Sequence, residues 1–156
     1  MSKFTEQIGM ETGNYFKAGY NCGESIIHAF RMHAGVDISD NAFRLASAFG
    51  GGCGHARDFC GAMAGSVMVI STLVGRNSPE EKKLDGIYPY SKEFQEIFVE
   101  KFGSTNCGDL MPYEFDTREH YINCMKLVNK VATALAEFLI KKGLIEDREV
   151  APIYKK

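Results

Sequence analysis

The 156-residue sequence has no tryptophan and few prolines, and its acidic and basic residues nearly balance, giving a net charge of −2. Because there is no basic surplus, neither a nucleic acid nor an anionic membrane surface is an expected partner. The N-terminal residues lack the apolar core of a signal peptide. The longest apolar run, residues 67–74, is far shorter than the ~20 residues that span a bilayer. These absences predict a cytoplasmic protein without membrane insertion.

Motifs of several enzyme classes are also missing. The sequence has no Ser/His/Asp arrangement, P-loop, dinucleotide fingerprint or H-E-x-x-H motif, so hydrolase, NTPase and nicotinamide-dependent functions have no support. It has no C-x-x-C pair of the kind found in zinc fingers, thioredoxin sites and bacterial ferredoxins. A C-x-x-C-H motif is absent too, which excludes covalent haem attachment by pattern.

What the sequence does contain is five cysteines, which is many for a cytoplasmic chain of this length: Cys22, Cys53, Cys60, Cys107 and Cys124. In a reducing compartment, such cysteines are more often metal-binding or catalytic than members of a disulfide framework. A chain of 156 residues can bury a sufficient core without such cross-links.

Apolar residues recur at helical spacing through most of the chain, and no strand alternation is convincing. We predict a single all-α domain over residues 1–156, a bundle of about five to seven helices around a central buried helix near residues 59–74. Capping boxes predict helix starts at Asn21 and at Ser78. Pro89 predicts a break, with helix resuming near Ser91. His28 and His33 are expected on an exposed face.

Two cysteines are predicted at helix N-termini. Cys22 follows the predicted N-cap, and Asp58 is predicted to cap the central helix, which would put Cys60 in its first turn. There the helix dipole favours a thiolate. Gly61 and Gly65 lie four residues apart on one face of this helix, and they would admit either another backbone or a bulky cofactor.

Three further residues are candidate accessory groups. Cys53 lies in a glycine-rich turn and could act as a resolving thiol or a substitute ligand, or be an incidental small residue. His55 lies between Cys53 and Cys60 and could be a ligand, a proton donor or simply solvated. His120 precedes Cys124 by four residues and would share its helix face.

These segments resemble the C_GCAxxG_C_C family of redox-active proteins, whose name spells its cysteine pattern. The resemblance covers most of the chain and rests on these segments: Tyr20-Asn21-Cys22, Gly50-Gly51-Gly52, Cys60-Gly61-Ala62-Met63-Ala64-Gly65, Phe102-Gly103-Ser104-Thr105-Asn106-Cys107-Gly108-Asp109-Leu110, and Cys124. It implies a small helical protein in which Cys22, Cys60, Cys107 and Cys124 form one redox or metal site. Cys53 is outside the family pattern, and Pro89 falls in a stretch that is usually continuous helix.

Three hypotheses for this site follow. The first is an iron–sulfur cluster on the four cysteines, serving electron transfer or redox sensing. The second is metal-free thiol–disulfide chemistry between pairs of the same cysteines, and the third is a structural zinc site in a transporter-associated accessory protein. An electron carrier or sensor is favoured over an enzyme with its own organic substrate, although a role as an oxidoreductase component stays open. The redox partner is not identified, and a homo-oligomer stays open.

Overall fold

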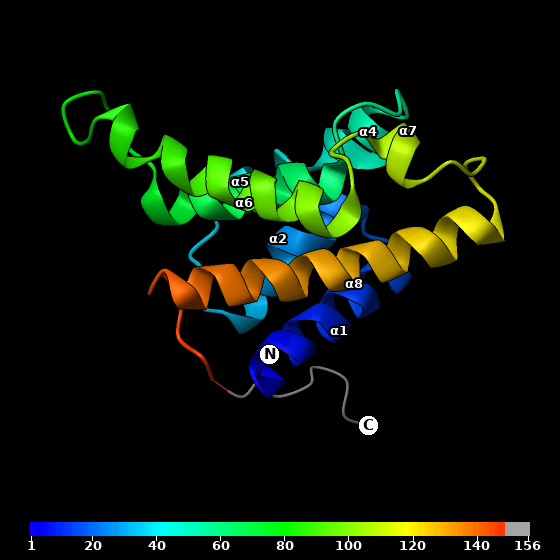
Figure 1. The fold of residues 1–156 in the computed structure, drawn as a ribbon, viewed down its shortest axis with the longest axis horizontal. Coiled ribbons are helices and arrows are strands. Elements are labelled where there is room, and N and C mark those ends of the chain that lie inside the picture. The colour runs from blue at the N-terminus through cyan, green and yellow to red at the C-terminus, as the bar shows by residue number, and fades with distance from the viewer. Residues whose placement is uncertain (149–156) are drawn as a thin grey trace.

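The computed structural model describes residues 1–148, and these residues form a bundle of helices (Figure 1). The long helices are α1 (Lys3–Lys17), α2 (Cys22–His33), α5 (Gly61–Val74), α6 (Tyr88–Phe102) and α8 (Arg118–Lys141). Shorter segments are α3 (Asp40–Arg44), α4 (Gly50–Cys53), α7 (Cys107–Leu110) and the 3-10 turns η1 (Ser47–Phe49) and η2 (Leu84–Gly86). Within residues 1–148 the only β pairing is an isolated bridge between Phe59 and Asn106. The predicted all-α fold is confirmed.

The helices pack in layers. In Figure 1, α5 and α6 lie side by side above α2, and α8 crosses below them next to α1. The helix α2 contacts α1, α5 and α8, so it shares the centre of the bundle with the buried first half of α5. The short segments α4 and α7 sit together at one end of the molecule. This end carries the cysteines described below.

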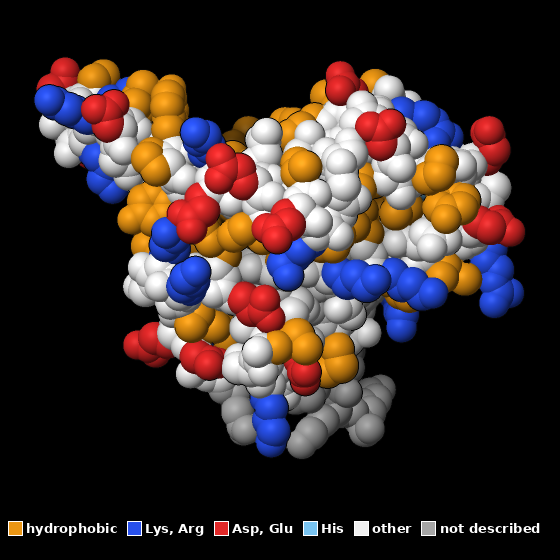
Figure 2. All heavy atoms as spheres, in the orientation of Figure 1, with side chains coloured by type: hydrophobic (Ala, Val, Ile, Leu, Met, Phe, Trp, Pro, Cys, Tyr) orange, Lys and Arg blue, Asp and Glu red, His pale blue; other side chains and the backbone are white. Residues whose placement is uncertain are grey.

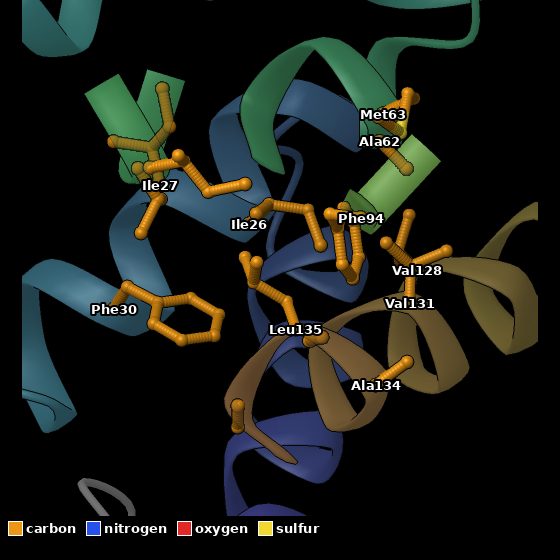
Figure 3. Close-up of a cluster of buried hydrophobic side chains, with 14 of the residues drawn as sticks. Ile26, Ile27, Phe30, Ala62, Met63, Phe94, Val128, Val131, Ala134 and Leu135 are labelled. Atoms are coloured by element: carbon orange, nitrogen blue, oxygen red, sulfur yellow. The ribbon is translucent and has the colours of Figure 1, made fainter. Parts of the chain in front are cut away.

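Aliphatic and aromatic side chains from four helices fill the interior. Figure 3 shows Ile26 and Phe30 of α2 meeting Leu135 of α8, with Phe94 of α6 and Met63 of α5 beside them. All five are essentially inaccessible to water. Burying a side chain of this size contributes roughly 1.5–3 kcal/mol of transfer free energy. The bundle is therefore held together by ordinary hydrophobic packing, without any need for metal or disulfide.

Several helix starts agree with the sequence prediction. Asn21 caps α2 by accepting from the Glu24 N–H at 2.9 Å, and the Glu24 carboxylate accepts from the Asn21 N–H at 3.0 Å. This reciprocal pair is the predicted capping box. Ser39 caps α3 by a single bond, in which its hydroxyl accepts from the Ala42 N–H at 3.2 Å. These local bonds explain why α2 and α3 begin where they do.

Three predictions were wrong. The segment from Ser78 to Glu81 is a turn and not a helix start, because the Glu81 carboxylate accepts from the Asn77 N–H across the turn. Pro89 does not break a helix but lies in the first turn of α6, where its missing N–H costs nothing. His33 is buried and not exposed, because its Nε2 is 3.1 Å from the Tyr15 hydroxyl.

The surface carries charges of both signs. On the face shown in Figure 2, acidic and basic side chains are interspersed with small hydrophobic areas. Among residues 1–148, no helix combines the length and the apolarity needed to cross a membrane.

Candidate functional site

Four cysteines from four separate helices gather at one end of the bundle. Cys22 is the first residue of α2, Cys60 is the N-cap of α5 and Cys107 is the first residue of α7, while Cys124 lies in the second turn of α8. All four side chains are buried, and none of them forms a disulfide. Each thiol influences the pKa of at least one of the others, so they form one electrostatic group.

Cys60 and Cys107 are brought together by the bridge between Phe59 and Asn106. The Cys60 N–H donates to the Thr105 carbonyl at 2.8 Å, and the Cys107 N–H donates to the Asp58 carbonyl at 2.6 Å. Both cysteines follow a bridge residue, and alternate residues of an extended pair share a face. The side chains of Cys60 and Cys107 are therefore diagonal neighbours on one face of the bridge.

Cys22 and Cys124 form a second pair with a different character. A hydrogen bond from the Cys124 thiol to Cys22 is the largest influence that lowers the pKa of Cys22 to about 7. Backbone N–H groups of Gly51 and Gly23 also stabilise the thiolate. Together with Cys124 they outweigh burial, which by itself would raise the pKa of Cys22. Because the hydrogen bond and burial favour its protonated form, the pKa of Cys124 is raised well above its ordinary value. Near pH 7 Cys22 is therefore about half thiolate, while Cys124 remains a protonated thiol.

The prediction for Cys60 was wrong in two respects. Asp58 does not cap α5, since Cys60 itself occupies the N-cap position and the helix has no side-chain cap bond. The pKa of Cys60 is raised to about 12, because burial outweighs the N–H groups of Met63 and Ala62 that face its sulfur. Burial also raises the pKa of Cys107, against a lowering effect of Arg57. The thiolate predicted at a helix N-terminus is at Cys22 instead.

Glycines allow the sulfurs to lie this close to backbone. A Cβ added at Gly61 would collide with the Cys22 sulfur and approach the Phe49 carbonyl oxygen at 2.8 Å. A Cβ at Gly52 would lie 2.5 Å from the Cβ of Cys107. Gly65 faces α2, where a Cβ would approach the Gly23 carbonyl oxygen at 2.8 Å. Of the two roles expected for Gly61 and Gly65, the structure shows close approach of another segment of backbone.

The loop over the site has an unusual backbone. Gly51, Gly52 and Gly54 have positive φ, and so do the non-glycine residues Cys53 and His55, at 69° and 62°. A side chain in this region costs conformational energy, and such strain is characteristic of functional sites. The left-handed turn directs the Gly51 N–H towards Cys22.

A stack of side chains anchors this loop to the segment before α8. Arg57, also at positive φ, donates to the carbonyls of Met111 and Tyr113, and its guanidinium lies 4.1 Å from the centre of the Phe115 ring. The His55 ring stacks on Phe115 at 4.1 Å. Sequence reasoning missed Phe115, since an aromatic residue in an irregular loop gives no periodic signal.

The three accessory candidates lie in different environments. Cys53 is exposed and is not part of the buried group of thiols. His55 is exposed at the edge of the site. His120 is partly buried and packs edge-on against Phe115 at 4.9 Å, and burial lowers its pKa. Its Nε2 is the one buried side-chain nitrogen or oxygen in residues 1–148 without a hydrogen-bond partner.

An open cavity of about 670 Å³ leads from the surface to the second pair of thiols. Cys22 and Cys124 are part of its wall, together with His55 and His120, whereas Cys60 and Cys107 are not. A reagent or ligand can therefore approach one pair of cysteines directly. The other pair lies behind it.

The arrangement constrains the metal that the site could take. Within residues 1–148, no three His, Cys, Asp or Glu side chains are grouped as one metal ion would require. A single tetrahedral ion such as zinc needs three or four donors around one point, so the thiols as placed do not fit it. A two-iron cluster is ligated by two protein groups on each iron, and the four buried thiols supply the number of ligands that it requires.

Comparisons with known proteins agree with the cysteine pattern. Residues 20–138 match the family described as "Putative redox-active protein (C_GCAxxG_C_C)". A similar curated protein, an uncharacterised protein of Archaeoglobus fulgidus, is 26% identical over 118 residues, covering 70% of this chain and 78% of its own length. No solved structure matches the chain. Because the family match spans well over half of the sequence, the chain belongs to the C_GCAxxG_C_C family of redox-active proteins.

Proposed function

We propose that this redox-active protein works by thiol–disulfide chemistry, with Cys22 as the reactive thiolate and Cys124 as its partner. The observation that carries the proposal is that both thiols line one open cavity, where interaction with the Cys124 thiol lowers the pKa of Cys22 to about 7. A thiolate is the species that enters disulfide exchange, and a pKa near the ambient pH is the most effective. The cavity beside the pair gives an oxidant or reductant access.

The chemical step is a two-electron oxidation. A bond forms between the Sγ atoms of Cys22 and Cys124, the single thiol proton leaves Cys124, and two electrons pass to an acceptor. Both side chains line the same cavity and each is the largest influence on the pKa of the other, so the two thiols are close neighbours before the bond forms. The N–H groups of Gly51 and Gly23 stabilise the charge on Cys22 before the reaction and after the disulfide is reduced.

An iron–sulfur cluster is the second candidate, favoured by the pairing of all four thiols. Cys22 and Cys124 would ligate one iron and Cys60 and Cys107 the other. Such a cluster would supply one-electron transfer. Burial raises the pKa of Cys60 and of Cys107, the latter against a lowering effect of Arg57. Of the four thiols, Cys22 and Cys124 line the open cavity, whereas Cys60 and Cys107 do not, and we place the metal-free reaction of the accessible pair first.

One preparation tests both candidates. The protein is purified without oxygen, its visible spectrum, iron and acid-labile sulfide are measured, and it is then treated with diamide and mapped by mass spectrometry. We expect a colourless protein that forms a disulfide between Cys22 and Cys124. Iron and sulfide bound in equal amounts, with the absorption lost in a Cys60→Ser variant, would instead establish the cluster. Four free thiols after diamide, in folded and metal-free protein, would reject the thiol–disulfide proposal.

A further inference from the structure

The cavity beside Cys22 and Cys124 has the size and lining of a ligand site. Its volume of about 670 Å³ lies within the range of small-molecule pockets. We propose that it binds an uncharged, flat aromatic electron acceptor of the quinone class, which takes electrons from the cysteine pair. This inference rests on the proposed function, since it names the oxidant of the same thiols.

Aromatic rings form one wall of the cavity and bare backbone forms another. Phe16 and Tyr121 lie with their ring centres 5.5 Å apart, and Tyr20 also lines the space. Gly50 and Gly51 contribute a wall without side chains. A flat ring can stack on the first wall at the usual centroid separations and approach the second closely.

The charge of the lining argues against an anionic ligand. Among the described residues that line the cavity there is no lysine or arginine, and the only carboxylate is that of Glu24. This carboxylate accepts from the Asn21 N–H at 3.0 Å and from the Ser47 hydroxyl at 2.9 Å, so it is not available to a ligand. The N-terminus of α2 also borders the cavity, but its first N–H groups are already used, because those of Cys22 and Gly23 face the Cys22 sulfur and that of Glu24 donates to the Asn21 side chain. A phosphate-bearing carrier such as a nucleotide would therefore lack the cationic or helix N-terminal partners that it usually needs, whereas an uncharged carrier needs neither.

His120 provides a polar partner that the protein itself leaves unused. Its Nε2 is buried and unpaired within residues 1–148, although His120 is part of the cavity lining. An unpaired buried nitrogen is costly, and such a group in a native protein calls for an explanation. Burial lowers the pKa of His120, so the ring is neutral near pH 7, and a rotation of this side chain that opens its Nε2 to the cavity would let it donate to a carbonyl oxygen. A quinone presents such an oxygen on an otherwise apolar ring.

The reaction balances with one proton from the solvent. The Cys22 thiolate, the Cys124 thiol, one quinone and one proton give the Cys22–Cys124 disulfide and one hydroquinone. The two electrons of the thiol pair reduce the quinone, and the second hydroquinone proton is the one lost by Cys124.

The absence of tryptophan allows a clean binding test. Tyr121, at the rim of the cavity and 42% exposed, is replaced in a Tyr121→Trp variant; Tyr88, 62% exposed at the start of α6, gives the matched Tyr88→Trp control. The probe is duroquinone, whose fully substituted ring cannot add a thiol. We expect saturable fluorescence quenching in the Tyr121→Trp protein only. Equal, linear quenching in both variants, or saturation by flavin mononucleotide but not by duroquinone, would overturn the proposal.

A second variant separates the ligand site from the thiol chemistry. Ala48 is exposed at the edge of the cavity, so Ala48→Phe adds bulk there without disturbing the core. We expect duroquinone binding to weaken at least tenfold, while excess diamide still converts the protein completely to the Cys22–Cys124 disulfide, at a lower rate because diamide enters through the same cavity. Unchanged quinone binding in Ala48→Phe would reject the cavity as the binding site. Failure of diamide to oxidise the wild type would reject the thiol–disulfide function and leave the binding result to stand by itself.

Discussion

The two pairs of cysteines lie in one end of the bundle but differ in electrostatics and access. Cys22 and Cys124 line an open cavity, and interaction with the Cys124 thiol lowers the pKa of Cys22 to about 7. Cys60 and Cys107 are held side by side by a backbone bridge, and burial raises the pKa of each. Both Cys22 and Cys60 are at the start of a long helix, so a helix N-terminus by itself does not make a reactive thiol.

What separates Cys22 from Cys60 is the number and kind of groups that face the sulfur. Cys22 receives a hydrogen bond from a neighbouring thiol and from N–H groups of two glycines. Cys60 has two N–H groups of its own helix and no thiol donor, and desolvation dominates. Stabilisation of a buried thiolate thus needs several donors together, because each one only partly offsets the loss of water.

The sharpest way to break this comparison is to remove one sulfur at a time. We expect Cys22→Ser and Cys124→Ser to abolish the disulfide formed with diamide, whereas Cys60→Ser and the exposed Cys53→Ser keep it. Peptide mapping after alkylation is the measurement. If Cys60→Ser lost the disulfide while Cys22→Ser still formed one, the assignment of the reaction to Cys22 and Cys124 would be wrong.

Close packing of the two pairs predicts a large effect at Gly61. Because a Cβ there meets the Cys22 sulfur and the Phe49 carbonyl, Gly61→Ala should lower the free energy of unfolding by about 2 kcal/mol. The matched control is Gly13→Ala in α1, where the nearest atom to an added Cβ is 3.9 Å away. That variant should be neutral or gain up to about 1 kcal/mol from helix propensity. The free energies of unfolding of both variants are measured by denaturant titration. Equal changes in Gly61→Ala and Gly13→Ala would show that the site is not tightly packed.

The pKa of about 7 at Cys22 predicts a shallow pH dependence of its alkylation. Its iodoacetamide rate should fall roughly tenfold from pH 8 to pH 6, whereas a thiol with an ordinary pKa falls closer to a hundredfold. The rate is followed by mass spectrometry of the peptide that contains Cys22, with N-acetylcysteine as the reference. In Cys124→Ala the dependence should steepen, because the main stabilising hydrogen bond is lost. A profile as steep as that of the reference would contradict the assignment.

The smallest expected effect concerns alkaline stability. The folded-state pKa of Cys60 is raised from 9.0 to about 12, so the folded protein holds this proton while the unfolded chain releases it. The stabilisation is full below pH 9 and is lost as the pH rises towards 12. We expect the reduced protein to lose roughly 2–4 °C in Tm for each kcal/mol given up in this range. The decline should be shallower in Cys60→Ala, and identical slopes would show that Cys60 does not contribute.

Local bonds explain which parts of the fold were predictable. The capping box of Asn21 and Glu24 is made within four residues, so the start of α2 and the position of Cys22 can be derived from the sequence. The pattern at Ser78 is similar, yet it closes a turn, because Glu81 bonds to the N–H of Asn77. A proline is compatible both with a break in a helix and with the first turn of one, and in this structure Pro89 lies in the first turn of α6.

The sequence by itself determined the helical class, the main helix starts and the family, because these depend on periodicity, short-range caps and a cysteine pattern. It could not determine which sulfurs pair, since the four cysteines come from distant segments. Only the tertiary structure places the Cys124 thiol and the Gly51 N–H against Cys22. It also makes Cys60, in place of Asp58, the N-cap of α5 and buries its thiol, which raises its pKa. The physical reason is that a thiol pKa depends on desolvation and on donors contributed by other segments of the chain, which local sequence does not encode.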